Sequence, residues 1–90
     1  MAALFDLGRV VATPGALEAL EVSGVPVVQL LSRHQSGDWG EVPREDAREN
    51  ERSVRDSFRI ISSYAIGEDR LWIITEADRS STCLLLPSEY

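Results

Sequence analysis

The last third of the chain, residues 59–90, constrains the fold more than any other segment. It contains three short apolar runs, RIISSYAI, RLWIITEA and SSTCLLLP, each with the length and composition of a strand. Gly67, Glu68 and Asp69 separate the first two runs as a hairpin loop. A polar run from Asp78 to Ser81 separates the second from the third. The segment therefore predicts a three-stranded antiparallel meander.

The segment before the meander begins with a predicted strand and a predicted helix. Leu7 to Ala12 contains a β-branched pair and is too apolar to lie unpaired, so we expect it to join the same sheet. Thr13 is a suitable N-cap, and Pro14 suits the first helical position because its missing N–H costs nothing there. Gly24 is a suitable residue to end this helix.

Two further helices are predicted before the meander. The second begins after Pro26, has its apolar stripe at i, i+3, i+4 and i+7, and ends at Gly37; the stripe is Val27, Leu30, Leu31 and His34. The third is highly charged and runs from Pro43 to about Ser57. The sequence thus predicts one α+β domain over residues 1–90 in the order β-α-α-α-β-β-β. Three helices would cover one face of an antiparallel sheet of about four strands.

The apolar residues predict a core and a second buried surface. The expected core or interface positions are Leu17, Leu20, Leu30, Leu31, Trp72, Ile74 and Leu85. Alternation along the second meander strand makes both of its faces apolar, whereas an antiparallel sheet usually leaves one face in water. We therefore expect a homodimer, or a partner, to cover the second face.

The third helix has few apolar positions facing inward. Its stripe is Ala47, Val54 and Phe58, and Asn50 falls within it. A buried amide is costly unless its hydrogen bonds are satisfied. Asn50 is expected to bond the backbone of the preceding GDWG loop, or else to meet a partner. Ion pairs expected along the polar face are Glu45 with Arg48, Glu51 with Arg55, and Arg52 with Asp56.

Charge and cysteine content exclude several function classes. The net charge is −6 and all nine basic residues are arginine, so the chain lacks the basic surface that grips phosphates and is not expected to bind nucleic acid directly. Its acidity either keeps the protein dissolved or lets it occupy a surface that normally receives nucleic acid. A lone Cys83, no signal-peptide pattern and no long apolar run predict a cytoplasmic chain without a membrane segment.

The residues that most often carry chemistry have structural interpretations here. His34 is the only histidine, so a multi-histidine metal site is excluded, and its place in the last helical turn suits a core-edge histidine favoured by the helix dipole. Cys83 is surrounded by apolar neighbours and is not expected to act as a nucleophile. No catalytic residue, metal ligand or cofactor is expected.

Two loops leave alternatives open. Trp39 in the GDWG loop is either a lid over the core or a binding anchor. Glu76, Asp78 and Arg79 form either a polar site or a solvated turn held by an arginine–carboxylate pair.

Several segments resemble a family of small bacterial proteins carried on plasmids, phages and integrative elements. These segments are VATPGALEAL, HQSGDWGEV, RIISSY and LWIITEADRSSTCLLLPSEY, and they cover nearly the whole chain. The blocks GDWG and WIITEADRS are the most distinctive. The resemblance implies a mobile-element setting, where small acidic inhibitors of host defence, of the anti-CRISPR or anti-restriction kind, recur. It supplies no catalytic residues.

Two function classes follow. The first is a non-catalytic binding protein that contacts a host protein complex, with binding residues expected at Asp38, Trp39, Glu41, Glu45, Asp46, Glu49, Glu76, Asp78 and Arg79. The second is a small enzyme or ligand-binding domain that uses the loops around Trp39 and Glu76 to Arg79. Exposed carboxylates without a pocket would favour the first class, and a pocket that joins these loops would favour the second.

Overall fold

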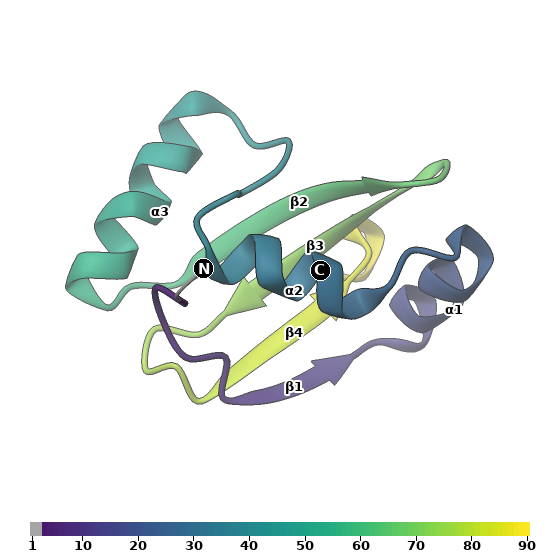
Figure 1. Cartoon of the computed structure of the whole chain (residues 1–90), viewed down its shortest axis with the longest axis horizontal. Coiled ribbons are helices and arrows are strands. Elements are labelled where there is room, and N and C mark those ends of the chain that lie inside the picture. The colour runs from purple at the N-terminus through teal and green to yellow at the C-terminus, as the bar shows by residue number, and fades with distance from the viewer. Residues whose placement is uncertain (1–2) are drawn as a thin grey trace.

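The computed structural model describes residues 3–90 and confirms the predicted order of elements (Figure 1). Its strands and helices are β1 (Arg9–Ala12), α1 (Pro14–Ser23), α2 (Val27–Gln35), α3 (Arg44–Asp56), β2 (Ile60–Ile66), β3 (Asp69–Thr75), β4 (Ser81–Leu85) and the short 3₁₀ helix η1 (Pro87–Glu89). The α+β class is therefore established. The first strand is shorter than the predicted Leu7 to Ala12.

The four strands form one sheet in the order β1-β4-β3-β2. The meander β2-β3-β4 is antiparallel as predicted, but β1 pairs parallel with β4, from Arg9 opposite Ser81 to Ala12 opposite Leu84. The prediction of a purely antiparallel sheet was therefore wrong. Parallel pairing requires a long crossover connection, and the helices and hairpin between β1 and β4 provide one.

The hairpin between β2 and β3 is tighter than predicted. Ile66 pairs with Asp69, so the turn contains only Gly67 and Glu68. Gly67 has φ +63°, whereas Glu68 does not have a positive φ. Glycine at the first turn position with a positive φ is typical of a type II′ hairpin, whose twist matches that of the flanking strands.

Helix α1 begins and ends where the sequence predicts. The Thr13 hydroxyl accepts a hydrogen bond from the Ala16 N–H at 3.1 Å, and the Gly24 N–H, at φ +72°, donates to the Leu20 carbonyl at 3.0 Å. Glu89 reaches the same helix start, where its carboxylate accepts from the Gly15 N–H and from the Thr13 hydroxyl. The C-terminal segment is therefore fastened to α1.

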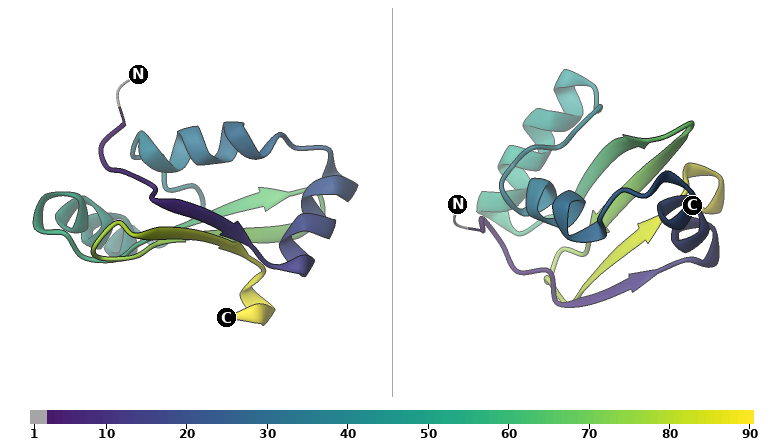
Figure 2. Two further views of the ribbon diagram at one scale, coloured as in Figure 1. Left: turned by 90° about the horizontal axis from the view of Figure 1, so that it is seen from below. Right: turned by 45° about the vertical axis from the view of Figure 1, so that its right-hand side comes forward.

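Helices α1 and α2 cover one face of the sheet, and η1 lies on the other (Figure 2). The main core on the covered face includes Ala16, Ala19, Leu20, Leu30, Tyr64, Ile66, Leu71, Ile73 and Leu84. Leu20 and Leu30 are buried as predicted and Leu31 is half-buried. Leu17 does not belong to the core, because it is 57% exposed, and a place for it in an interface stays a prediction.

Helix α3 lies beside β2 at the edge of the sheet (Figure 1). Ala47 and Val54 pack against a second apolar cluster of Phe5, Trp39 and Ile60. Phe58 does not continue this stripe and is 55% exposed. The helix ends at Ser57, whose φ of +58° turns the chain away before Phe58. None of the ion pairs predicted along α3 forms among residues 3–90.

Asn50 bonds a different backbone segment from the one predicted. Its amide group donates to the Ile61 carbonyl at 2.8 Å and accepts from the Ile61 N–H at 3.1 Å. The GDWG loop instead bonds the backbone of Ser63, two residues further along the same edge of β2. The Ser63 N–H donates to the Trp39 carbonyl, and the Glu41 N–H donates to the Ser63 carbonyl. Together these bonds cover an edge that would otherwise be open to another strand.

The second face of the sheet is covered in part by the chain itself. Ile74 and Leu85 on this face are buried, and Trp72 is half-buried. The ring of Tyr90 packs edge-on against Trp72 with 5.6 Å between ring centroids. The C-terminal segment of the chain itself therefore covers part of this face, and a second copy or a partner over the rest stays a prediction.

Candidate functional site

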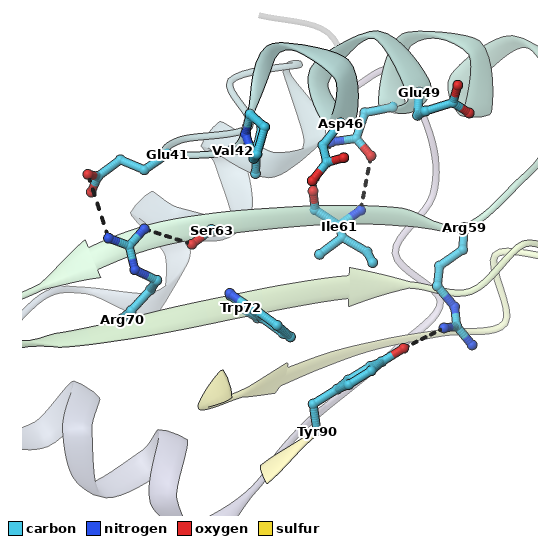
Figure 3. A pocket seen from close by; sticks show the side chains of 12 residues that line it. Glu41, Val42, Asp46, Glu49, Arg59, Ile61, Ser63, Arg70, Trp72 and Tyr90 are labelled. Atoms are coloured by element: carbon cyan, nitrogen blue, oxygen red, sulfur yellow. Dashed lines mark hydrogen bonds and ion pairs between the residues drawn. The ribbon is translucent and has the colours of Figure 1, made fainter. Parts of the chain in front are cut away.

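A cleft of about 490 Å³ opens on the second face of the sheet, between α3 and the C-terminal residue (Figure 3). We call it the α3 cleft. Its lining residues are Glu41, Val42, Pro43, Asp46, Glu49, Asn50, Arg59, Ile61, Ser63, Arg70, Trp72 and Tyr90. This volume lies in the range of sites that hold a small ligand or a side chain of a partner.

The floor of the cleft comes from two paired strands. Side chains alternate between the faces of a sheet, so Ile61 and Ser63 of β2 share a face with Arg70 and Trp72 of β3. Ser63 lies directly opposite Trp72 in the β2–β3 register. Tyr90 forms one wall against Trp72 (Figure 3). The floor is therefore built on paired strands and is partly aromatic.

Both arginines of the cleft already have partners. The Arg70 guanidinium donates to the Ser63 hydroxyl at 3.2 Å and lies 3.8 Å from the Glu41 carboxylate. The Arg59 guanidinium donates to the Tyr90 hydroxyl and to the Glu76 carboxylate, each at 3.2 Å. These pairs are 43–60% exposed, so each contributes little to stability. Their effect is to neutralise the positive charge of the cleft.

The opposite rim carries carboxylates on α3. Asp46 lies in the first turn of this helix, where the helix dipole favours negative charge, and its carboxylate points toward the sheet (Figure 3). Glu49 follows one turn later and is exposed. Within residues 3–90, neither carboxylate has a cationic partner within 4.0 Å. The rim therefore presents negative charge that the chain does not neutralise.

The structure brings together part of the predicted binding set. Glu41, Asp46 and Glu49 line the cleft, and Glu76 contacts it through Arg59. Glu45 lies on the same helix but does not line the cleft. The remaining predicted residues, Asp38, Trp39, Asp78 and Arg79, do not line it.

Trp39 is a lid over the core rather than an exposed anchor. Only 5% of it is exposed, and its ring stacks on Phe5 with centroids 6.3 Å apart. Asp38 beside it accepts two hydrogen bonds from Arg33, the shorter at 2.7 Å, and this contact holds the pKa of Asp38 below its usual value. The GDWG loop is thus tied to α2 and to β2.

Arg79 fastens the β3–β4 loop to α3. Its guanidinium donates to three carbonyls, those of Ser53 at 2.7 Å, Phe58 at 2.7 Å and Glu76 at 3.1 Å. The predicted arginine–carboxylate pair within this loop was therefore wrong, because the Glu76 carboxylate pairs with Arg59 instead. Asp78 accepts from the Ser80 N–H at 3.0 Å in a local turn.

His34 is fully buried at the centre of a polar chain of hydrogen bonds, 2.6 Å from the Ser62 hydroxyl and 2.9 Å from that of Thr75. The Thr82 hydroxyl donates to the Leu7 carbonyl, so it must accept from Thr75. Thr75 then accepts from His34 Nε2–H, which leaves Nδ1 to accept from Ser62. The bonding pattern therefore requires the neutral Nε2–H tautomer.

Burial, and then the charge of Arg79, lower the pKa of His34 from 6.5 to about 4. His34 packs as a core histidine as expected, but it lies inside the core rather than at its edge, and burial disfavours the positive charge that the helix dipole would favour. Cys83 is half-buried, and burial raises the pKa of its thiol. No group of three or more potential metal ligands occurs within the described part of the chain.

Sequence reasoning did not assign Asn50, Arg59, Ile61, Arg70, Trp72 or Tyr90 to the cleft. The signal for the floor was present in the alternation along β2 and β3, which places these strand residues on the second face. The signal for Tyr90 was absent, since nothing local predicts that the chain returns to contact Trp72.

No helix of the described residues is long and apolar enough to cross a membrane. In comparisons with known proteins, no family model, curated protein or solved structure matches this chain. The resemblance to the mobile-element family stays a prediction, and the functional conclusion rests on the geometry of the α3 cleft.

Proposed function

We propose that this chain is a non-catalytic binding protein that contacts a protein partner through the α3 cleft. One observation carries the proposal: the cleft joins a partly aromatic floor on paired strands to the carboxylates of Asp46 and Glu49, which have no cationic partner among residues 3–90. Aromatic residues in a partly enclosed site supply much of the binding energy at protein interfaces. Exposed carboxylates supply orientation and speed of association.

The chain's own bonds support a binding surface rather than a flexible loop site. Asn50 and Ser63 are held by backbone hydrogen bonds along β2, so the floor and the α3 rim keep a fixed separation. A preformed site loses less conformational entropy when it binds. The proposal therefore favours a partner that inserts a side chain or an edge into the cleft.

The resemblance to mobile-element proteins suggests a sharper version, in which the partner is a host defence complex. Glu41, Asp46 and Glu49 carry negative charge on the cleft side of α3 and just before its start, on a chain of net charge −6. Such a surface complements the basic channel with which a defence complex grips nucleic acid. The chain would then act as an inhibitor by occupying that channel.

Charge reversal on α3 tests the binding surface. A partner is first retained on the immobilised wild-type chain from a bacterial lysate, identified and purified, and its affinity for single variants is then measured. We expect Glu49→Lys to weaken binding at least about tenfold, because it places positive charge at the cleft rim. Glu45→Lys, on the same helix but outside the cleft, is the matched control. Equal affinity of wild type and Glu49→Lys would overturn the proposed surface.

Plasmid transformation tests the inhibitor version. The chain is expressed in a host with an active restriction or CRISPR system, and a targeted plasmid is introduced. We expect the wild-type chain to raise transformation efficiency and Glu49→Lys to abolish the increase. No increase with any defence system tested would contradict the inhibitor version.

A pocket is present, so the expected sign of the first class, carboxylates without a pocket, is not met in full; but the pocket does not join the loops around Trp39 and Glu76 to Arg79, so a small enzyme or ligand-binding domain at those loops has less support. Trp39 is buried, and Arg79 is occupied by three backbone carbonyls. The volume of the α3 cleft suits a small molecule, so a ligand-binding domain that uses this cleft is the form of the alternative with most support. Binding of a metabolite, with no protein retained, would support that version.

A further inference from the structure

We infer that the α3 cleft recognises an arginine side chain, which the partner inserts between the carboxylates of α3 and the face of Trp72. This inference rests on the proposed function, because it specifies the chemistry of the same site. It goes further in naming one side chain as the inserted group.

The charge of the cleft selects a cation. Glu41, Asp46, Glu49 and Glu76 contribute four carboxylates at or beside the lining, whereas Arg59 and Arg70 contribute only two guanidinium groups. Each of these arginines already bonds a hydroxyl and pairs with a carboxylate, Arg59 with Glu76 at 3.2 Å and Arg70 with Glu41 at 3.8 Å. An anionic ligand would have to displace those carboxylates. A cation meets Asp46 and Glu49 with no such exchange.

The floor selects a flat cation. Trp72 is half-buried and Tyr90 packs edge-on against it, so the open part of the indole is held in one orientation. A guanidinium stacks on an aromatic face and at the same time donates two parallel hydrogen bonds to a carboxylate. An ammonium offers a single point of charge and cannot do both equally well. Arginine therefore suits this site better than lysine.

The chain makes the same kind of contact within its own fold. The Arg33 guanidinium lies 4.6 Å from the centroid of the Tyr64 ring and also bonds the Asp38 carboxylate at 2.7 Å. An aromatic face and a carboxylate thus clamp one guanidinium. The α3 cleft presents the same two groups, an indole floor and an α3 carboxylate, without an internal guanidinium between them.

The cleft has room for the inserted group. Its volume of about 490 Å³ exceeds what a single side chain fills, so the flanking backbone of the partner also enters. The α3 rim carries Asp46, with its carboxylate toward the sheet, and Glu49 (Figure 3). An extended segment with one arginine fits this arrangement.

The test is a nuclear magnetic resonance titration of the full chain with the peptide acetyl-Gly-Arg-Gly-amide. We expect shifts at the Trp72 indole N–H and at the backbone amides of Ile61 and Asp46. The peptide with citrulline, which has the same shape without the charge, should bind at least about fivefold more weakly. The glutamate peptide should produce no shifts in the cleft.

Matched variants tie binding to the rim. Asp46→Asn combined with Glu49→Gln removes the charges that line the cleft, and we expect the affinity for the arginine peptide to fall about fivefold or more. Glu45→Gln combined with Glu51→Gln removes as much charge from the same helix outside the cleft and should leave the affinity unchanged. Both variants retain the hydrogen bonds of Asn50, so neither is expected to unfold.

Three results would overturn the inference: no shifts with the arginine peptide, equal binding of the citrulline peptide, or equal losses in both variants. None of them would by itself overturn the proposed function. That proposal is tested with the protein partner, and it fails if Glu49→Lys leaves binding of that partner unchanged. The two failures are therefore distinguishable.

Discussion

Lowering the pH below 6.5 should destabilise this protein, and the buried His34 should be the cause. The folded chain holds this histidine neutral, with its Nε2–H given to Thr75 and its Nδ1 accepting from Ser62. Protonation adds a second N–H at Nδ1. The Ser62 hydroxyl donates its hydrogen to Nδ1 in the neutral form, so two hydrogens would then meet and this bond would be lost unless the hydroxyl turns. It also places a charge in a fully buried site.

The size of the effect follows from the two pKa values of His34. They are about 4 in the folded chain and 6.5 when unfolded. Between these values the unfolded chain binds more protons than the folded one, so stability rises with pH across the window and is lost as pH falls through it. The full difference corresponds to about 3 kcal/mol. This is a large part of the stability of a 90-residue domain.

The carboxylates act in a lower window. The pKa values of Asp38, Asp78 and Glu89 are held below their usual values, in each case first by a side-chain hydrogen bond, from Arg33, Ser80 and Thr13 respectively. The stability that these three groups contribute is present above their usual pKa values of 3.8 to 4.5 and is lost below that range. The interval from pH 6.5 to 4.5 therefore reports mainly on His34, the only histidine in the chain.

Urea unfolding at a series of pH values measures the effect. We expect the free energy of unfolding of the wild type to fall by about 2 kcal/mol or more between pH 7 and pH 4.5. His34→Gln is the matched variant, because its amide offers one donor and one acceptor to the same hydroxyls. It should be less stable at pH 7 and nearly flat over the same interval. A flat wild-type profile, or the same slope in both proteins, would refute this account.

Three further substitutions test the packing that positions the cleft. Asn50→Ala leaves the N–H and carbonyl of Ile61 without their partner, and we expect a loss of about 2–4 kcal/mol in urea unfolding; a loss below about 0.5 kcal/mol would contradict it. Gly40→Ala places a Cβ against the Ser63 carbonyl oxygen at a residue with φ +74°, so it should cost at least about 2 kcal/mol and speed amide exchange along β2. Wild-type exchange in that variant would show that the loop does not cover this edge. Arg79→Ala removes three bonds to carbonyls and should cost about 2 kcal/mol, with faster exchange at the end of α3; unchanged exchange there would count against the clamp.

Features that depend on neighbouring residues could be predicted from the sequence. Thr13, Pro14 and Gly24 set the ends of α1 through contacts within one helical turn, and all three act as predicted. The meander also follows from local composition. The length of its first turn was overestimated by one residue, because Asp69 begins β3 instead of closing the loop. Local turn preferences do not show at which residue the pairing of two strands begins.

Features that depend on residues far apart in the chain could not be predicted from the sequence. The parallel pairing of β1 with β4 joins Arg9 to Ser81, and no local pattern fixes the direction of strands so far apart. Asn50 was recognised as a buried amide in need of bonds, but the sequence does not show that β2 rather than the GDWG loop would lie beside it. The chain of bonds through His34 likewise needs hydroxyls from three strands.

The sequence predicted the acidic rim of the candidate site but not its floor or its wall. The acidic rim at Asp46 and Glu49 follows from charge density on one helix, which the sequence displays directly. The floor required the register that places Ser63 opposite Trp72, and the wall required Tyr90 to return to that face. Trp39 and Arg79 were predicted as binding residues, and each has a large side chain with a polar group. In the fold Trp39 is buried in the core, and Arg79 bonds backbone carbonyls.

Hydrogen exchange of the chain with and without its purified partner tests most directly whether the α3 cleft is the binding surface. The account predicts slower exchange in residues 41–50, 59–63 and 70–72, the segments that contain the lining residues, and no change along α1 or α2. Glu49→Lys should remove this protection while Glu45→Lys retains it. Protection confined to α1 and α2, or to the edge of β1, with the cleft residues unchanged, would contradict the claim.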